Sequence, residues 1–245
     1  MSDHRFGDAL GDLAGGRTDA STLARVSRLA AASAREAGGA AVASGRWAAD
    51  QLLEIAPRIP VRDRQTLEAQ HGGRTGTALA DVLVRDATRV AAAIGGAAGA
   101  LVSAEELAPP AWVAIPVELV VETLAVAAVE LKLVAELHAA YDMAIEGPAG
   151  ERAMTLVRSW ADRRGVSVRH LARRGGVADA LGRGTRNEVV RIVRRRLLRR
   201  LGRNLSSLMP MLIGAVAGAE LNRRATRSLG EELQRDLERL RSRDA

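Results

Sequence analysis

Histidine, serine and acidic side chains carry much of enzyme chemistry, and in this chain they form no known catalytic pattern. The sequence contains no G-x-S-x-G, no H-E-x-x-H and no S-x-x-K motif. Cysteine is absent, which removes thiolate metal ligands and cysteine nucleophiles. One E-x-x-H pair exists, Glu68 with His71, whereas a di-iron bundle needs a second such pair and further glutamates. We therefore predict no catalytic residue, no metal ligand and no cofactor.

His138 is the histidine whose surroundings invite a functional interpretation. At helical spacing it falls on the same side as Val120, Leu124 and Leu131, and Tyr141 follows within one turn. We interpret it as a core histidine that needs a hydrogen-bond partner in a neighbouring helix. The alternative that stays open is an enzyme or small-ligand binder with a pocket between helices near His138 and Tyr141.

Acidic residues gather on the opposite side of the same helix. Glu118 and Glu122 lie one turn apart, and Lys132 and Glu136 fall on that side as well. A pair of carboxylates can serve acid–base chemistry, but charged pairs of this kind are usual on the exposed faces of helical bundles. We interpret the pair as part of a solvated face.

Positive charge is concentrated near the C-terminal end of the chain. Between positions 183 and 203 there are nine arginines and one acidic residue, Glu188, in a chain whose net charge is +7. Valine and leucine recur at helical spacing between positions 190 and 201, which predicts a basic amphipathic helix. The residues predicted to bind an anionic surface are Arg191, Arg194, Arg195, Arg199, Arg200 and Arg203.

Three interpretations of this basic helix stay open. Insertion of its apolar stripe and attraction to anionic lipid would favour a membrane surface. Its arginines would also suit the phosphate backbone of a nucleic acid, although an aromatic content of 2% leaves few side chains for base stacking. The third interpretation is an ordinary solvated helix face in an arginine-rich protein.

Small residues recur at steps of four in two segments. The residues of this helix-packing motif are Gly95 and Gly99 in one segment, and Pro210, Gly214, Gly218 and Asn222 in the other. Small residues at i and i+4 allow another helix to approach closely. We predict a direct contact between the two glycine rows, with Asn222 hydrogen-bonded to neighbouring backbone.

All periodic segments have a helical period, so we predict an all-α multi-helix bundle with an aliphatic core. Asp63 is the expected N-cap of a short helix in the connector after Pro57. The long helix over 115–141 is expected to be buried around most of its circumference. The other expected helices cover about 21–36, a segment from Trp47 to before Pro57, 78–103, 151–164, 185–202, and from about 206 through a kink at Gly230 into a charged tail.

No segment is long and apolar enough to be a transmembrane helix, because the longest runs without charge have fifteen and sixteen residues. The N-terminus lacks the apolar stretch of a secretory signal. We therefore expect a cytoplasmic protein, located peripherally at the inner face of the cell membrane if the basic helix binds lipid.

The run LMPMLIGAVAGAELN resembles the C-terminal signature of the EcsC family, a largely uncharacterised bacterial family. The order of the upstream segments is also similar to that of the family. These segments are IPVRDRQTL, AAAIGGAAGAL, VELVVETLAVAAVELKLVAELHAAYD and MTLVRSWADRRG. The resemblance covers about 57–230 and divides the chain into an N-terminal helical segment 1–56, an EcsC-like helical domain 57–230 and a charged tail 231–245. It implies an envelope context, because the family takes its name from a gene beside a bacterial ABC transporter, and it implies no catalytic residues.

The function predicted from the sequence is non-catalytic. The basic helix would associate peripherally with an anionic membrane surface or with an envelope or transport partner. An enzyme or ligand binder with a pocket near His138 is the alternative, and a nucleic-acid binder ranks third. The oligomeric state is left open.

Overall fold

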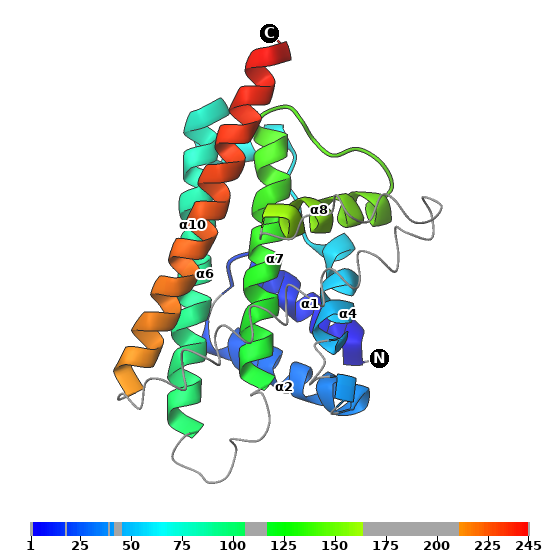
Figure 1. The fold of residues 1–245 in the computed structure, drawn as a ribbon, viewed down its shortest axis with the longest axis vertical. Coiled ribbons are helices and arrows are strands. Elements are labelled where there is room, and N and C mark those ends of the chain that lie inside the picture. Colours follow the sequence, from blue (N-terminus) through cyan, green and yellow to red (C-terminus); the bar gives the residue numbers. More distant parts are fainter. Residues whose placement is uncertain are drawn as a thin grey trace.

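The described part of the chain is built from α-helices joined by turns, without a β-strand (Figure 1). The computed structural model describes residues 2–17, 19–38, 40–41, 46–105, 117–163 and 211–244. Its elements are α1 (Ser2–Ala14), α2 (Ala20–Ala37), α4 (Arg46–Ile55), the 3-10 turn η1 (Ala56–Arg58), α5 (Arg64–Gln70), α6 (Gly76–Glu105), α7 (Val117–Ala140), α8 (Ala149–Arg163) and α10 (Met211–Asp244). The all-α multi-helix bundle predicted from the sequence is confirmed.

The central helix of the bundle is α7, which packs against each of the other described α-helices. Every residue from Val120 to Tyr141 is buried except Lys132 and His138, which are partly exposed. A helix that is apolar around its circumference is stable in water only when other helices cover it. The burial expected for this helix is therefore confirmed.

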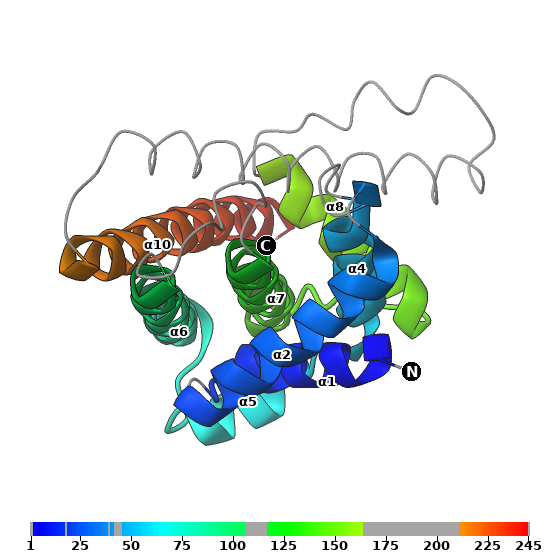
Figure 2. The ribbon, with the colours of Figure 1, turned by 90° about the horizontal axis from the view of Figure 1, so that it is seen from below.

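The two longest helices, α6 and α10, lie beside α7 and pack extensively on each other (Figures 1 and 2). Leu79, Val84 and Ala91 of α6 are buried, as are Leu229, Leu233 and Leu237 of α10. The three leucines of α10 are spaced four residues apart, which keeps them on one face of the helix.

The N-terminal helices α1, α2 and α4 also pack on α7 (Figure 2). The helix α1 was not predicted from the sequence. It buries Phe6, Leu10 and Leu13 completely, and the Phe6 ring stacks on Trp47 of α4 with 6.1 Å between ring centroids. Gly7 and Gly11 interrupt its pattern and lower its intrinsic helix propensity, so tertiary packing supplies most of its stability.

Local sequence signals fix two of the helix starts. Asp63 is the N-cap of α5, and its carboxylate accepts a hydrogen bond from the Thr66 amide at 2.7 Å, as predicted. Asp19 caps α2 in the same way through the Thr22 amide at 2.9 Å. Both carboxylates satisfy backbone donors that would otherwise lack a partner within the helix.

The helix α10 continues through Gly230 as one element of 34 residues. Gly230 is buried, and a Cβ atom added there would lie 2.7 Å from a Val84 methyl carbon. The glycine thus permits close contact with α6. Residues 231–244, which were expected to be a charged tail, form the C-terminal part of this packed helix.

Several predicted features lie outside the described residues. They are Pro210, the start of the helix expected at 115, and the basic helix at 185–202 with Arg191, Arg194, Arg195, Arg199, Arg200 and Arg203.

Candidate functional site

The structure brings Gly95 of α6 against Gly218 and Asn222 of α10. A Cβ atom added to Gly95 would lie 2.5 Å from the Gly218 carbonyl oxygen and 2.5 Å from Asn222 Nδ2. No side chain larger than hydrogen fits at this point without a backbone shift. Gly99 and Gly214 lie on the same two helices.

Asn222 is buried, and its Nδ2 donates to Glu122 Oε1 of α7 at 2.7 Å. The expected partner was neighbouring backbone, so that detail of the prediction is wrong. The side chain of a third helix takes its place because Glu122 is itself buried and its carboxylate needs hydrogen-bond donors. The expectation of a solvated face is therefore also wrong for Glu122.

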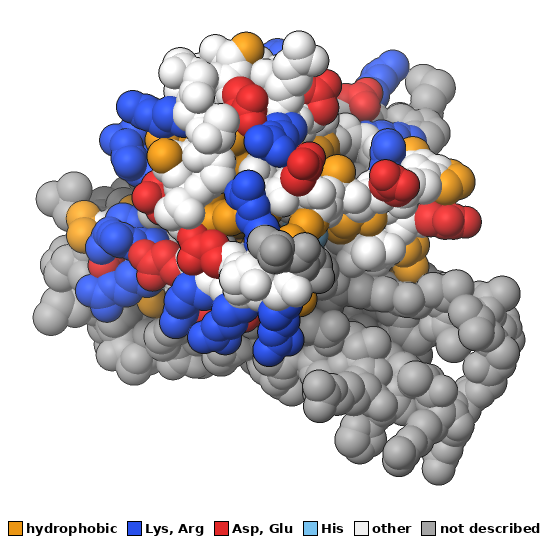
Figure 3. Space-filling model, turned by 90° about the horizontal axis from the view of Figure 1, so that it is seen from above, with side chains coloured by type: hydrophobic (Ala, Val, Ile, Leu, Met, Phe, Trp, Pro, Cys, Tyr) orange, Lys and Arg blue, Asp and Glu red, His pale blue; other side chains and the backbone are white. Residues whose placement is uncertain are grey.

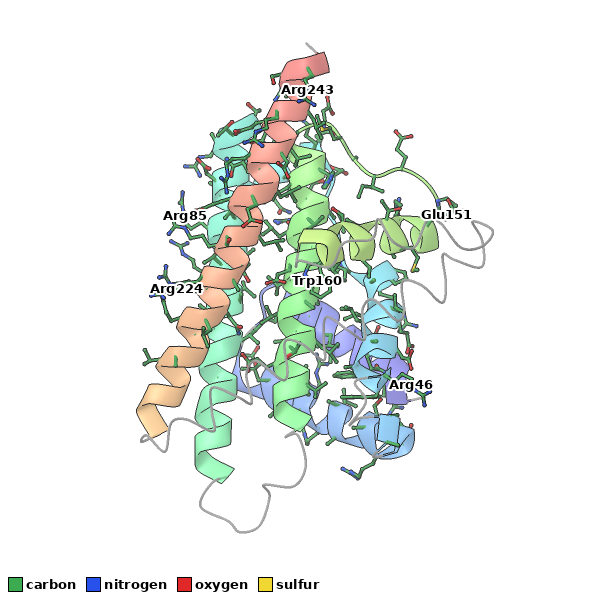
Figure 4. All side chains as sticks on the ribbon, in the orientation of Figure 1. Arg46, Arg85, Glu151, Trp160, Arg224 and Arg243 are labelled. Atoms are coloured by element: carbon green, nitrogen blue, oxygen red, sulfur yellow. The ribbon has the colours of Figure 1, made fainter. Side chains whose placement is uncertain are left out.

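A second buried carboxylate, Glu130, joins three helices. Its Oε2 accepts from Trp160 Nε1 of α8 at 2.8 Å, and its Oε1 accepts from Thr226 Oγ1 of α10 at 3.0 Å. Glu130, Trp160 and Thr226 are almost completely buried, and Figure 4 shows Trp160 where α8 meets α7. No sequence signal singled out Glu130, because its donors come from positions 30 and 96 residues away.

The third buried carboxylate, Glu136, lies between two cations. Arg62 contacts both carboxylate oxygens, with Nε at 2.7 Å from Oε1 and Nη2 at 2.8 Å from Oε2. Lys132 Nζ lies 2.6 Å from Oε1 and also donates to the Pro60 carbonyl. The hydrogen bonds to Glu136 raise the pKa of Arg62 above its ordinary value. This bidentate pairing gives the carboxylate the partners that burial requires.

A pocket of about 210 Å³ opens beside this cluster. Its wall combines the ion-paired side chains with aliphatic side chains of α6 and α7 and with the turn after α1. The lining residues are Ala14, Gly15, Gly16, Arg62, Leu83, Asp86, Ala87, Val90, Val129, Lys132, Leu133 and Glu136.

His138 and Tyr141, the centre of the pocket expected from the sequence, do not line this pocket. His138 Nδ1 lies 2.7 Å from the Val134 carbonyl of its own helix. Tyr141 is buried, and its hydroxyl donates to Glu238 Oε1 of α10 at 2.9 Å. Thr77 of α6 donates to the same oxygen at 3.0 Å, so Glu238 connects α10 with α6 and with the turn after α7.

Within the described residues, no three histidine or acidic side chains are grouped so that they could hold a metal ion. In that same part of the chain, no helix combines the length and the apolar character needed to cross a bilayer. Comparison with family models, with curated proteins and with solved structures gives no match. The resemblance to the EcsC family thus stays a prediction.

Proposed function

We propose that the protein is a non-catalytic helical protein that associates peripherally with an anionic membrane surface through the arginines between 191 and 203. The observation that supports this proposal is the distribution of charge along the sequence. Residues 164–210 contain 13 arginines and two acidic residues, a net charge of +11. The whole chain carries +7, so the other residues together carry −4.

Several arginines of the described helices pair with acidic residues. Arg223 and Arg224 both pair with Glu220, and Arg227 pairs with Glu231 at 2.7 Å. Figure 3 shows acidic and basic side chains next to one another over the end of the molecule seen from above. Such mixed surfaces have little net field.

The basic segment has few acidic residues at the corresponding spacings. Glu188 stands three positions before Arg191, but no Asp or Glu stands three or four positions from Arg194, Arg195 or Arg199. Each basic residue near an anionic bilayer contributes about 1 kcal/mol of attraction. The valines and leucines between 190 and 201 would add apolar insertion to this attraction.

The resemblance to the EcsC family supports an envelope context for this proposal. An envelope or transport protein with an acidic surface would satisfy the same charges, and it is the second partner to test. The buried carboxylates support a non-catalytic role, because Glu122 and Glu130 bind side chains of other helices and Glu136 binds Arg62 of the connector before α5.

The proposal is tested by co-sedimentation of the full chain with vesicles. One set contains only zwitterionic phosphatidylcholine, and the other contains phosphatidylcholine mixed with anionic phosphatidylglycerol. We expect binding to the anionic vesicles alone, weakened by added salt because screening reduces attraction between exposed charges. The double substitution Arg195→Glu and Arg199→Glu should abolish most of the binding.

The matched control is Arg28→Glu with Arg35→Glu, which changes the net charge equally at two exposed positions of α2. Loss of binding in both double variants would mean that total charge, not the basic segment, controls association. Equal binding to both kinds of vesicle, or none, would contradict the proposal. Tighter binding to duplex DNA, with a steep dependence on salt, would favour the nucleic-acid alternative.

A further inference from the structure

We infer that the pocket beside Arg62, Lys132 and Glu136 binds a small aliphatic monocarboxylate. The lining residues of this site are different from the arginines of the proposed membrane contact, so either proposal can fail without the other. It combines cationic hydrogen-bond donors at one end with an aliphatic wall, within a volume of about 210 Å³. A ligand that fits must have an acceptor with negative charge and a short apolar body.

Donors remain at the polar end after the internal contacts are made. Arg62 donates through Nε and Nη2 to Glu136 and through Nη1 to Gln70 at 2.7 Å. Lys132 donates to the Pro60 carbonyl and to Glu136. Among the described residues, these contacts leave one N–H of Lys132 and two N–H groups of Arg62 without an acceptor.

The charge of this end favours a monoanion. Three cations, Arg62, Lys132 and Arg89, stand against two carboxylates, Glu136 and Asp86, which leaves one positive charge in excess. Asp86 also lines the pocket, but it is half-exposed and lies 3.5 Å from Arg89. A ligand with several negative charges would therefore meet Asp86 and Glu136 without enough cations to offset the repulsion.

The remaining wall is aliphatic. Leu83, Ala87 and Val90 of α6 face Val129 and Leu133 of α7, and no aromatic side chain of the described residues lines the pocket. A short alkyl chain gains from leaving water against such a wall, whereas a nucleobase or other aromatic ring would find no stacking partner.

The test measures thermal unfolding of the full chain in increasing concentrations of sodium pentanoate. Sodium chloride at equal ionic strength, pentylamine hydrochloride and leucine are the comparisons. A ligand that binds only the folded protein raises Tm with its concentration, and the dissociation constant follows from that dependence. We expect pentanoate to raise Tm above the chloride value. Pentylamine should not, and leucine should bind more weakly because its ammonium group would lie beside two cations.

Two variants locate the effect. Ala87→Leu fills the pocket and leaves all three ionic side chains in place, so it should remove the effect of pentanoate. Its matched control is Ala93→Leu on the exposed face of α6, which should keep the effect. Lys132→Met removes one donor and should weaken pentanoate binding about tenfold or more, since a charge-assisted hydrogen bond is lost.

Three outcomes would contradict the assignment. An equal Tm in pentanoate and chloride, an unchanged effect in Ala87→Leu, or tighter binding of leucine or pentylamine would each overturn the assignment. If Lys132→Met does not fold, the comparison of Ala87→Leu with Ala93→Leu still decides whether this pocket is the site.

Discussion

Asn222 lies where α6, α7 and α10 meet, and it contacts the buried carboxyl group of Glu122. Its Nδ2 donates to Glu122 Oε1 at 2.7 Å, and both side chains are almost completely buried. Because a buried carboxylate loses its hydration, each donor that approaches it contributes strongly to stability. Asn222 therefore acts at the residue scale as a polar contact within an apolar interface.

We predict that Asn222→Ala lowers the free energy of unfolding by about 2–3 kcal/mol, because Glu122 loses a buried donor. Asn222→Asp should destabilise more at neutral pH, since it places a second carboxylate against Glu122. Urea unfolding followed by circular dichroism measures both changes. If Asn222→Asp is as stable as the alanine variant, Glu122 is protonated in the folded protein. Its contact with Asn222 is then a hydrogen bond between two neutral groups.

Tyr141 provides a residue-scale prediction about pH, because it is the single tyrosine of the chain. Burial, reinforced by the carboxylate of Glu238, raises the pKa of Tyr141 to about 12 from its ordinary 10.0. The folded state then keeps the hydroxyl proton in the range where the unfolded chain loses it. Stability from this group is complete below pH 10 and is lost as pH rises through 12.

We expect the tyrosinate absorbance of the folded protein to rise with a midpoint well above 10, and that of the urea-unfolded protein to rise near 10. Circular dichroism at each pH shows whether the chain is still folded. Tyr141→Phe removes this titration and the associated loss of stability above pH 10. A midpoint near 10 in the folded protein would show that the hydroxyl is accessible to water, contrary to the structure.

At the scale of elements, the crossing of α6 and α10 depends on the absence of a side chain at Gly95. A Cβ atom there would meet backbone, the Gly218 carbonyl oxygen at 2.5 Å, which cannot rotate away. We predict that Gly95→Ala lowers the free energy of unfolding by about 2–3 kcal/mol, as overpacking of a core does. Thermal and urea unfolding measure the change.

Gly11→Ala is the matched control for this substitution. Gly11 lies in α1, and a Cβ atom added there has no neighbour within 4 Å. Alanine has the higher helix propensity, so this variant should be more stable by about 0.5–1 kcal/mol. Equal destabilisation of both variants would mean that helix backbone effects, not the contact with α10, explain the result.

The elements show what a single sequence can predict. Helical periodicity identified α2, α4, α6 and α7, and Asp63 identified the start of α5, because these signals are local. The helix α1 was missed because its glycines weaken a pattern that tertiary packing completes.

The buried glutamates were missed for a different reason. Glutamate is rarely buried without a partner, so Glu122 and Glu130 were not expected in the core. Their donors Asn222 and Thr226 lie 100 and 96 residues away, and nothing in a single sequence indicates that these positions meet. The pocket beside Arg62 was not predicted for the same reason, since Arg62 and Glu136 are 74 residues apart in the sequence.

At the scale of the whole molecule, the described helices form one hydrophobic cluster that extends from Phe6 to Leu237. The segments 1–56 and 231–244 both contribute buried residues to it. The C-terminal segment is the more informative case, because its composition is that of a charged tail. Leu233 and Leu237 are fully or almost fully buried, and Gln234 donates to Asp81 of α6 at 2.9 Å.

We predict that deleting residues 231–245 lowers the free energy of unfolding by about 4 kcal/mol or more, since two buried leucines are lost and their contacts on α6 and α7 become exposed. It should also lower the pKa of Tyr141, because the chain then lacks Glu238. The control is deletion of residues 239–245, which removes the exposed side chains of 239–243 with the last two residues and keeps Leu237 and Glu238. That shorter deletion should change stability by less than about 1 kcal/mol, as surface changes usually do. Equal stability of the two truncated chains in urea would show that the end of α10 is a solvated tail.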